Sequence, residues 1–289
     1  MTKKRRLFCE ISPLTYRISA EKEILKRQIT DALAGNRFAE IKSAEVLPVL
    51  IKKHRSLIRR RLNNVDIALQ ENKVKNLSIA TPLVTNVLIK PNEIFSFWNL
   101  VGRLSKRKGY LEGVTISNGK PTPGIGGGMC QFTNLLHWMI LHTDLDIIEH
   151  HHHNMLDLFP DFKRQIPFGT GTSIVYNYLD YRVKNNTDKI YQVIVYTTEE
   201  YLCGEIRCNE PLPVKIHIRE EESCFYEQDG EIIRHNKIYR KIIDKETGKV
   251  LEDILLLENN AKVMYDRSFI NESDKKLIKK DAWSGYQNR

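Results

Sequence analysis

A glycine-rich stretch that leads directly into a cysteine is the part of this sequence best suited to chemistry. Residues 124–128 contain four glycines, and Cys130 and Gln131 follow at the start of an apolar run. A glycine turn before a helix leaves free N–H groups and the positive end of the helix dipole at the helix start. A cysteine placed there is expected to have a lowered pKa. The stretch therefore predicts a nucleophilic thiol at Cys130, and the alternative is a packed structural cysteine.

Four consecutive histidines, residues 150–153, offer a base for such a thiol. A thiol nucleophile needs a general base within hydrogen-bond reach. On an extended segment His151 and His153 point one way and His150 and His152 the other, so either pair could face Cys130. Two imidazoles on one face could instead share a metal ion. No spaced carboxylate or cysteine clearly completes such a site, so no metal is predicted, and the run could also be an exposed polar tract.

Two further polar residues fit a thiol mechanism. Asp180 lies inside a strand-like pattern, where a carboxylate is unexpected, and could orient the imidazole. Its alternative is an ordinary surface aspartate. The Gln131 side chain, or the N–H groups at the helix start, could stabilise an oxyanion. A second glycine loop, residues 169–173, lacks a phosphate-loop lysine and predicts no nucleotide site, and no cofactor is expected.

The remaining elements must position these side chains. Apolar residues recur at helical spacing over residues 19–35 and 47–62, which predicts two helices, and residues 65–87 are expected to be helix plus connection. A wide apolar face over residues 131–142 predicts a buried central helix. The predicted strands are residues 114–117, 146–158, 172–183, 191–197 and 201–207, followed by a β-meander over 214–257.

Together these elements predict an α+β fold. A helix that bears Cys130 would pack on an antiparallel sheet, behind a helical N-terminal region and ahead of the C-terminal β-meander. Cysteine on a helix, then histidine and aspartate on successive strands, is the order of papain-like and transglutaminase-like folds, by analogy. The expected parts are a basic helical region 1–90, a core 91–210, a β-rich extension 211–265 and a polar tail 266–289.

Composition narrows the class of protein. The 289 residues are 41% hydrophobic, which is ordinary for a globular protein, and the five cysteines form no CxxC pair, which favours reduced thiols. The net charge is +9, yet residues 1–90 alone hold 19 Lys/Arg and 8 Asp/Glu, a net of +11. This basic third predicts either an acidic partner or anionic membrane surface, or simply a solvated helix face; no nucleic-acid motif accompanies it. No signal peptide or membrane span is recognised, so the cytoplasm is the expected location.

Several of these motifs resemble those of the VanW family, named for an accessory protein of vancomycin resistance clusters. Residues 126–131 match its GGGxCQ signature, residues 91–97 its opening motif, and residues 109–110 its Gly-Tyr pair. Residues 148–154 are similar to a family segment whose histidine falls at His153. Residues 178–186 resemble the acidic strand and Asn-Asn turn that follow. The sequence departs from the family pattern at Thr133-Asn134, where Ser-Thr is usual, and at His150, where arginine is frequent.

The resemblance implies a link to glycopeptide resistance and cell-wall metabolism. On this interpretation Cys130 is the nucleophile, His153 the base and Asp180 the orienting residue in amide hydrolysis or acyl transfer on a cell-wall peptide or its precursor. Substrate-binding roles are expected for the residues around them: Gly127, Gly128, Gln131, Thr133, Glu149 and His151. The alternative is a non-catalytic module that binds a ligand or partner. Typical family members are exported or anchored, whereas this chain resembles a short soluble type.

Overall fold

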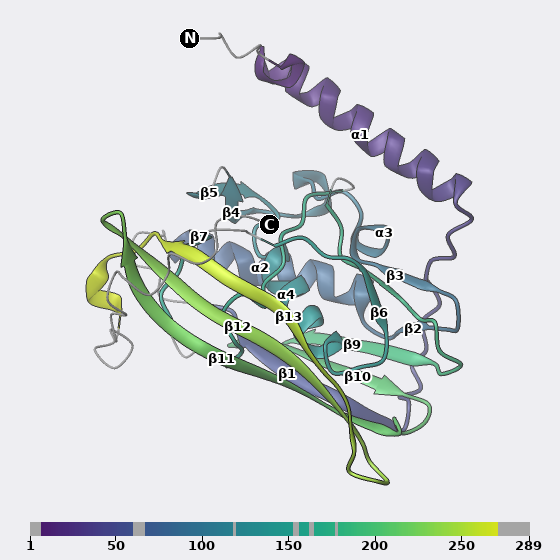
Figure 1. Ribbon diagram of the computed structural model, residues 1–289. Helices are drawn as coiled ribbons and strands as arrows, with labels where there is room; N and C mark the ends of the chain where they lie inside the picture. The colour runs from purple at the N-terminus through teal and green to yellow at the C-terminus, as the bar shows by residue number, and fades with distance from the viewer. Residues whose placement is uncertain are drawn as a thin grey trace.

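The computed structural model describes residues 7–59, 67–117, 120–152, 156–161, 165–176 and 179–270, which form helices and mainly antiparallel strands (Figure 1). The helices are α1 Pro13–Leu33, α2 Ile67–Val84, α3 Phe97–Val101 and α4 Met129–Ile140, with single 3-10 turns η1 Phe8–Glu10, η2 Lys106–Lys108 and η3 Arg267–Phe269. The strands are β1 Val49–Leu57, β2 Val87–Ile89, β3 Ile94–Ser96, β4 Glu112–Ser117, β5 Lys120–Ile125, β6 Asp146–Glu149, β7 Leu156–Asp157, β8 Arg182–Lys184, β9 Tyr191–Thr197, β10 Tyr201–Cys208, β11 Val214–Gln228, β12 Glu231–Asp244 and β13 Val250–Val263. The predicted α+β class is confirmed.

The core lies between two helices and one antiparallel sheet. Strands pair in the order β1-β10-β9-β2, α4 packs on β10 and β1, and α2 packs on β9. The wide apolar face of α4 supplies buried residues such as Phe132, Leu136 and Met139. Gly204 on β10 allows this close approach, because a Cβ at that position would lie 2.6 Å from Met139 Cε. The predicted buried helix is therefore confirmed.

The predicted helix over residues 47–62 is wrong, because residues 49–57 form strand β1. Its register against β10 runs from Val49 opposite Cys208 to Leu57 opposite Tyr201. The charged side chains that suggested a helix face lie along the strand: Lys52 stands over the Trp138 ring at 5.4 Å. Residues 60–62 lie outside the described part of the chain. Apolar spacing could not distinguish the two states, since the strand state depends on a partner far along the sequence.

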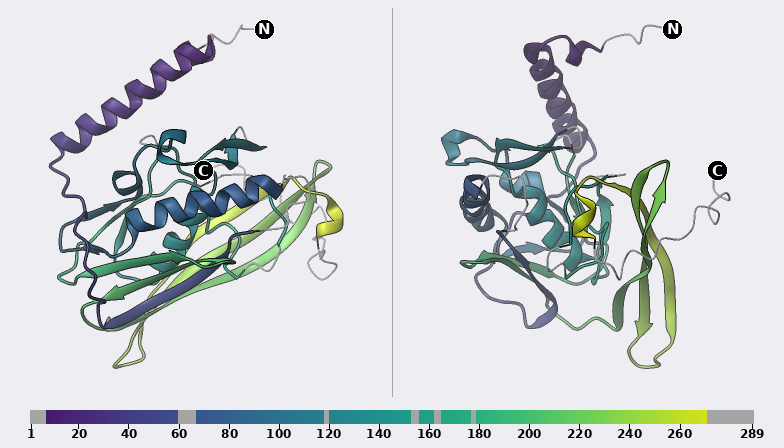
Figure 2. Two further views of the ribbon diagram at one scale, coloured as in Figure 1. Left: turned by 180° about the vertical axis from the view of Figure 1, so that it is seen from behind. Right: turned by 90° about the vertical axis from the view of Figure 1, so that its left-hand side faces the viewer.

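Helix α1 confirms the predicted helix over residues 19–35 but begins earlier. Ser12 is its N-cap, with Thr15 N donating to Ser12 Oγ at 3.2 Å. None of its residues is buried, and Figures 1 and 2 show it standing clear of the body over much of its length. The helix expected within residues 65–87 is α2. Within the described ranges, no helix has the length and apolarity needed to cross a membrane.

Two of the predicted strands are much shorter than expected. Of residues 146–158, β6 covers 146–149 and β7 covers 156–157. Of residues 172–183, the described part contains a bridge between Val175 and Leu179 and the start of β8. Residues around 170–176 form an irregular loop, because their hydrogen bonds go to α4 and the histidine segment. The β-hairpin β4–β5 forms where residues 114–117 were predicted to be a strand.

The C-terminal β-meander is confirmed as the long strands β11, β12 and β13, with β7 added in parallel. Figure 2 shows these strands as a layer beside the core. Arg240 links this layer to the core, donating to the Thr143 carbonyl at 2.6 Å. Asn236 and Asn259 both donate to the carbonyl of Phe168, at 2.8 and 3.4 Å. The domain boundaries expected at 90, 210 and 265 stay predictions.

Candidate functional site

The glycine run has a packing role that the sequence did not reveal. Gly128 is the N-cap of α4 with φ +113°, and a Cβ on Gly127 would lie 2.2 Å from the backbone carbon of Gly113. The Gly127 carbonyl accepts from Asn76 Nδ2 at 2.9 Å. The turn is thus pressed against the β4–β5 hairpin and helix α2, where no side chain would fit. The substrate-binding roles of Gly127 and Gly128 stay predictions.

Cys130 is the second residue of α4, as predicted, but its thiol is not activated. Burial raises the pKa of the Cys130 thiol, and hydrogen bonds from the backbone N–H groups of Ile174 and of Cys130 itself offset this only in part. The expected lowering of this pKa is therefore wrong. A helix start favours the thiolate modestly, whereas removal from water disfavours it strongly. The resting thiol is protonated at neutral pH.

A polar stripe runs along the otherwise apolar helix α4. Cys130, Thr133, Asn134 and His137 are spaced i, i+3, i+4 and i+7, so they share one face. Thr133 and His137 are buried. A buried polar side chain is costly unless it is hydrogen-bonded, so this stripe requires partners from elsewhere in the fold.

A loop formed by residues 169–174 supplies many of those partners. Thr172 donates its N–H to Asn134 Oδ1 at 2.6 Å and its hydroxyl to the same atom at 2.9 Å. The hydroxyls of Thr133 and Thr172 are also hydrogen-bonded. Thr133 therefore fixes this loop to α4. We call the α4 stripe, this loop and residues 150–151 the polar site.

The histidine segment closes the other side of this loop. His150 Nε2 lies 3.0 Å from the Gly171 carbonyl, and Ser173 N donates to the His151 carbonyl at 2.7 Å. Since a carbonyl only accepts, His150 Nε2 carries the proton and Nδ1 is free of it. The His150 ring stacks on His137, with centroids 4.1 Å apart and planes at 9°. His153, the preferred base, lies outside the described residues.

Burial keeps both stacked imidazoles neutral. It lowers the pKa of His137 well below 6.5, and the nearby His150 and His152 add to this effect. Burial also lowers the pKa of His150, although its hydrogen bond to Gly171 acts in the opposite sense. His137 Nδ1 lies 3.3 Å from the hydroxyl of Tyr181, whose pKa burial raises well above 10. The hydrogen bonds of His150 Nε2 and His151 Nε2 go to Gly171 and Glu149 and not to Cys130 Sγ.

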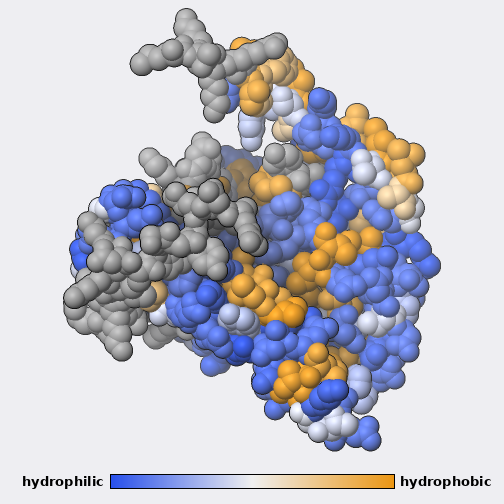
Figure 3. All heavy atoms as spheres, viewed as in Figure 1, coloured by the Kyte–Doolittle hydropathy of each residue, from blue (hydrophilic) through white to orange (hydrophobic). Residues whose placement is uncertain are grey.

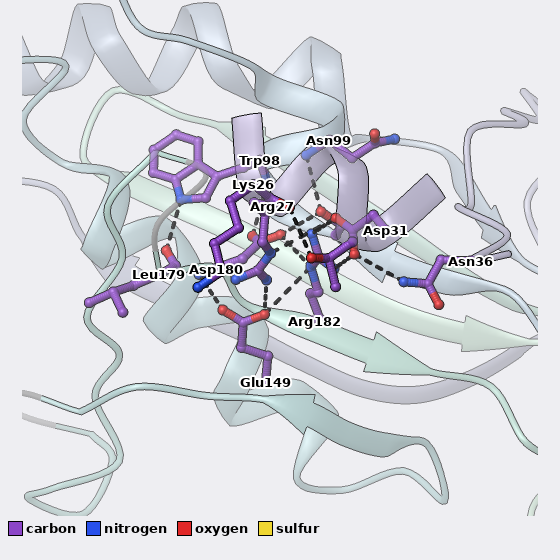
Figure 4. Close-up of polar contacts among 12 residues, drawn as sticks. Lys26, Arg27, Asp31, Asn36, Trp98, Asn99, Glu149, Leu179, Asp180 and Arg182 are labelled. Carbon is purple, nitrogen blue, oxygen red and sulfur yellow. Dashed lines mark hydrogen bonds and ion pairs between the residues drawn. The ribbon is translucent and has the colours of Figure 1, made fainter. Parts of the chain in front are cut away.

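Asp180 does not orient a histidine of the described segment. Its fully buried carboxylate accepts from Ser96 Oγ at 2.5 Å, from Arg182 Nε at 2.9 Å, and from the backbone N–H groups of Trp98 and Tyr181 at 3.0 and 2.8 Å. Figure 4 shows this carboxylate inside a cluster of charges. Asp180 therefore holds α3 and β8 together, which explains why a carboxylate interrupts the strand-like pattern.

The same cluster contains Glu149 and reaches helix α1. Arg182 donates to both oxygens of Asp31, at 2.6 and 2.7 Å. Glu149 accepts from Arg27, from the Asp180 N–H at 2.7 Å and from His151 Nε2 at 3.0 Å. Burial opposes ionisation of Glu149, yet these hydrogen bonds, that of Arg27 foremost, hold its pKa below the usual value. Glu149 is thus part of an ion-pair network (Figure 4), and His151 is hydrogen-bonded to it.

The side chain of Gln131 has a structural role. Its amide nitrogen donates to Ser56 Oγ and to the Leu57 carbonyl, both at 2.8 Å. These bonds fix the end of β1 to the start of α4. Both N–H groups of the amide are used in these bonds, and the oxyanion role suggested for this side chain stays a prediction. Within the described ranges, no group of three or more His, Cys, Asp or Glu is placed to hold a metal ion.

Comparison with known proteins shows which family this chain resembles. The model of the family described as VanW like protein matches residues 72–207, which include most of α2, all of α4 and the whole polar site. The Vancomycin B-type resistance protein VanW of Enterococcus faecalis (strain ATCC 700802 / V583) is 33% identical over 237 residues, covering 80% of this chain and 86% of that protein. The chain belongs to the VanW-like family.

A second relative matches a smaller part of the chain. The Uncharacterized protein YoaR of Bacillus subtilis (strain 168) is 28% identical over 113 residues, which is 38% of this chain and 34% of that protein. No solved structure matches this VanW-like chain. The papain-like analogy therefore stays a prediction.

Sequence reasoning missed His137, Tyr181 and Arg182. His137 could have been found from the sequence, because it follows Cys130 by seven residues and therefore lies on the same face of an apolar helix. Tyr181 and Arg182 could not have been found in this way, because they contact His137 on α4 and Asp31 on α1, which are distant in sequence. The VanW-like signature residues around Cys130 thus belong to a larger buried polar arrangement.

Proposed function

We propose that this VanW-like protein acts in vancomycin resistance and cell-wall metabolism as an accessory protein that binds a cell-wall peptide or its precursor at the polar site. The observation that carries the proposal is the state of Cys130. Its thiol is protonated and hydrogen-bonded by Ile174, while Asp180 and Gln131, the other groups expected to assist it, bond elsewhere. This arrangement supports recognition by fixed donors and acceptors better than it supports thiol chemistry. The resemblance to the Enterococcus faecalis resistance protein gives the biological context.

A second candidate function is acyl transfer or amide hydrolysis by Cys130. One observation favours it: the neutral imidazole of His150 contacts the same loop as the Cys130 thiol. The thiol proton would pass to His150 Nδ1 as sulfur attacks the peptide carbonyl. The C–N bond would then break, the leaving amine would take the proton, and water or another amine would release the acyl group from the thioester.

One set of measurements separates the two candidates. The purified chain is titrated calorimetrically with a panel of cell-wall peptides and soluble precursors, and each mixture is then examined by mass spectrometry. The binding proposal expects an unchanged peptide and an affinity that Cys130→Ser alters by less than about threefold. Cys203→Ser is the matched control, because Cys203 lies on β10 away from the loop.

Other outcomes decide against the binding proposal. Cleaved or transferred peptide, or an acyl adduct on Cys130, that is lost in Cys130→Ser would establish the second candidate. Absence of both binding and turnover for the whole panel would reject both.

In a resistant host, Asn134→Ala should lower the vancomycin concentration that the cells tolerate, because this change removes the two hydrogen bonds from Thr172 of the 169–174 loop to Asn134 of α4.

A further inference from the structure

Helix α1 presents one face to the body of the protein and holds it there by charge. Glu21, Arg27 and Asp31 of α1 form ion pairs with Arg103, Glu149 and Arg182 respectively. The Asp31–Arg182 pair is bidentate, which fixes orientation as well as distance. This face of α1 therefore has its partners within the same chain.

The opposite face carries an apolar stripe that is exposed. Its residues are Leu14, Ile18, Leu25, Ile29 and Leu33, whose exposed fractions run from 50% to 84%. At 100° per residue they fall on one side of the helix, away from Arg27 and Asp31, and Glu21 lies at the edge of the stripe, about 20° from Leu14. Figure 3 shows apolar side chains gathered along α1. Burying such a stripe in an apolar phase is favourable, so its exposure indicates a binding surface.

Lys22 and Lys26 border one edge of the stripe, and Glu21 at the other edge is paired with Arg103. Arg17, Lys22 and Lys26 are exposed on α1, whereas the acidic Glu21 and Asp31 are paired with the body. Residues 1–90 have a net charge of +11. An apolar stripe bordered by Lys and Arg fits the surface of an anionic lipid bilayer, where the apolar side chains enter the acyl boundary and the cations meet phosphates.

We propose that α1 docks in the plane of an anionic membrane surface through Leu14, Ile18, Leu25, Ile29 and Leu33. The helix is about 30 Å long, since each of its residues adds 1.5 Å. It lies on the membrane and does not cross it. Because three ion pairs hold α1 to the body, docking holds the polar site close to the lipid surface, whatever ligand that site binds.

Vesicle co-sedimentation with the full chain tests this proposal. The probes are vesicles of pure phosphatidylcholine and vesicles in which a third of the lipid is phosphatidylglycerol. The chain should sediment with the anionic vesicles and be released by high salt, because surface electrostatics are screened. Leu25→Glu with Ile29→Glu should weaken sedimentation by about tenfold or more. Lys22→Gln with Lys26→Gln should weaken it in low salt, since two cations beside the bilayer are lost.

The matched control alters apolar residues of similar exposure elsewhere. Leu251→Glu with Leu255→Glu changes two exposed side chains of β13 and should leave sedimentation unchanged. Circular dichroism and the melting temperature check that all variants fold.

Equal binding to both vesicle types, or equal binding by the α1 and β13 variants, would overturn the proposal. So would absence of vesicle binding together with a dimer in light scattering that Leu25→Glu with Ile29→Glu dissociates, because the stripe would then bind a second copy. Neither result bears on peptide binding at the polar site.

Discussion

At the residue scale, the pKa of the Cys130 thiol depends on two opposing effects, the helix start and burial. A helix start contributes up to about 2 kcal/mol toward an anion in favourable geometry. Burial acts against the charged form, and at Cys130 it outweighs the hydrogen bonds that favour the thiolate, so the pKa of this thiol is raised. Burial therefore decides the protonation state of Cys130. The glycine turn that suggested a reactive thiol serves close packing instead.

Thiol labelling should reveal this protected state. At neutral pH, Cys130 in the folded protein should react with a maleimide more than about tenfold slower than the same cysteine in the denatured chain, because its thiol is protonated and partly covered. Mass spectrometry of peptides from a pH series gives the rate for each cysteine. Fast labelling of Cys130 with a midpoint below about pH 8.5 would contradict the assignment.

Gly127 should be intolerant of any side chain. A Cβ there would lie 2.2 Å from the Gly113 carbonyl carbon and 2.5 Å from Val114 N, both backbone atoms that cannot move aside alone. Gly127→Ala should lower the free energy of unfolding by about 3 kcal/mol or more. The control is Gly171→Ala, whose methyl would meet nothing closer than 3.7 Å. Urea unfolding compares the two variants, and equal losses would contradict the packing role.

At the element scale, the ion-pair network attaches α1 to β6 and β8. Arg182 is its centre, bonded to Asp31 on α1 and to Asp180, and lying 3.5 Å from Glu149. Burial opposes ionisation of Asp31, but the hydrogen bonds from Arg182 hold its pKa below the usual value. The attachment of α1 is thus electrostatic, which suits a helix with no buried residue.

Removing Arg182 should be costly, because it leaves a fully buried carboxylate at Asp180 without its cation. Arg182→Gln should lower the free energy of unfolding by about 3 kcal/mol. The control is Arg59→Gln, which removes an exposed pair with Glu71 and should cost less than about 1 kcal/mol.

Asp31→Asn tests the attachment of α1 more locally. It should cost less than Arg182→Gln, because Arg182 keeps its bond to Asp180, but it should release α1 from the body. Limited proteolysis should then cut faster within residues 34–48 while the core stays intact. Unchanged cutting would show that α1 is held by other contacts.

At the scale of the whole molecule, buried neutral histidines make stability depend on pH. Burial and the nearby Lys52 lower the pKa of His142 to about 4, and burial lowers the pKa of His137 and His150 as well. Above about pH 6.5 these histidines are neutral in both the folded and the unfolded state and contribute no pH dependence. Below that pH the unfolded chain binds protons that the folded protein cannot, so stability falls with pH.

Unfolding by urea at pH 7.5, 6.5 and 5.5 should therefore show stability that is nearly constant at first and then decreases. Each such histidine adds a slope approaching about 1.4 kcal/mol per pH unit between its unfolded and folded pKa. His142→Gln should make the slope between pH 6.5 and 5.5 shallower, because it removes a buried neutral imidazole. A stability that rises toward pH 5.5 would contradict the neutral assignment.

The sequence by itself determined features that depend on neighbours within a few residues. The periodicity of apolar side chains predicted α1 and α4, a helix was expected within residues 65–87, and the strand over 114–117 and the meander over 214–257 were predicted as well. The position of Cys130 at a helix start followed from the glycines before it. The family was recognisable from short motifs, because those motifs are local as well.

The tertiary structure decided whatever depends on partners distant in sequence. Residues 49–57 are a strand because β10 lies beside them, and no local pattern contains that information. Asp180 is buried in an ion pair because α3 and β8 meet at its carboxylate, and Arg182 links it to Asp31 of α1. Cys130 is a protonated thiol because the 169–174 loop covers it. Burial and electrostatics act between residues that are close in space, so protonation and pairing are fixed when distant segments come together.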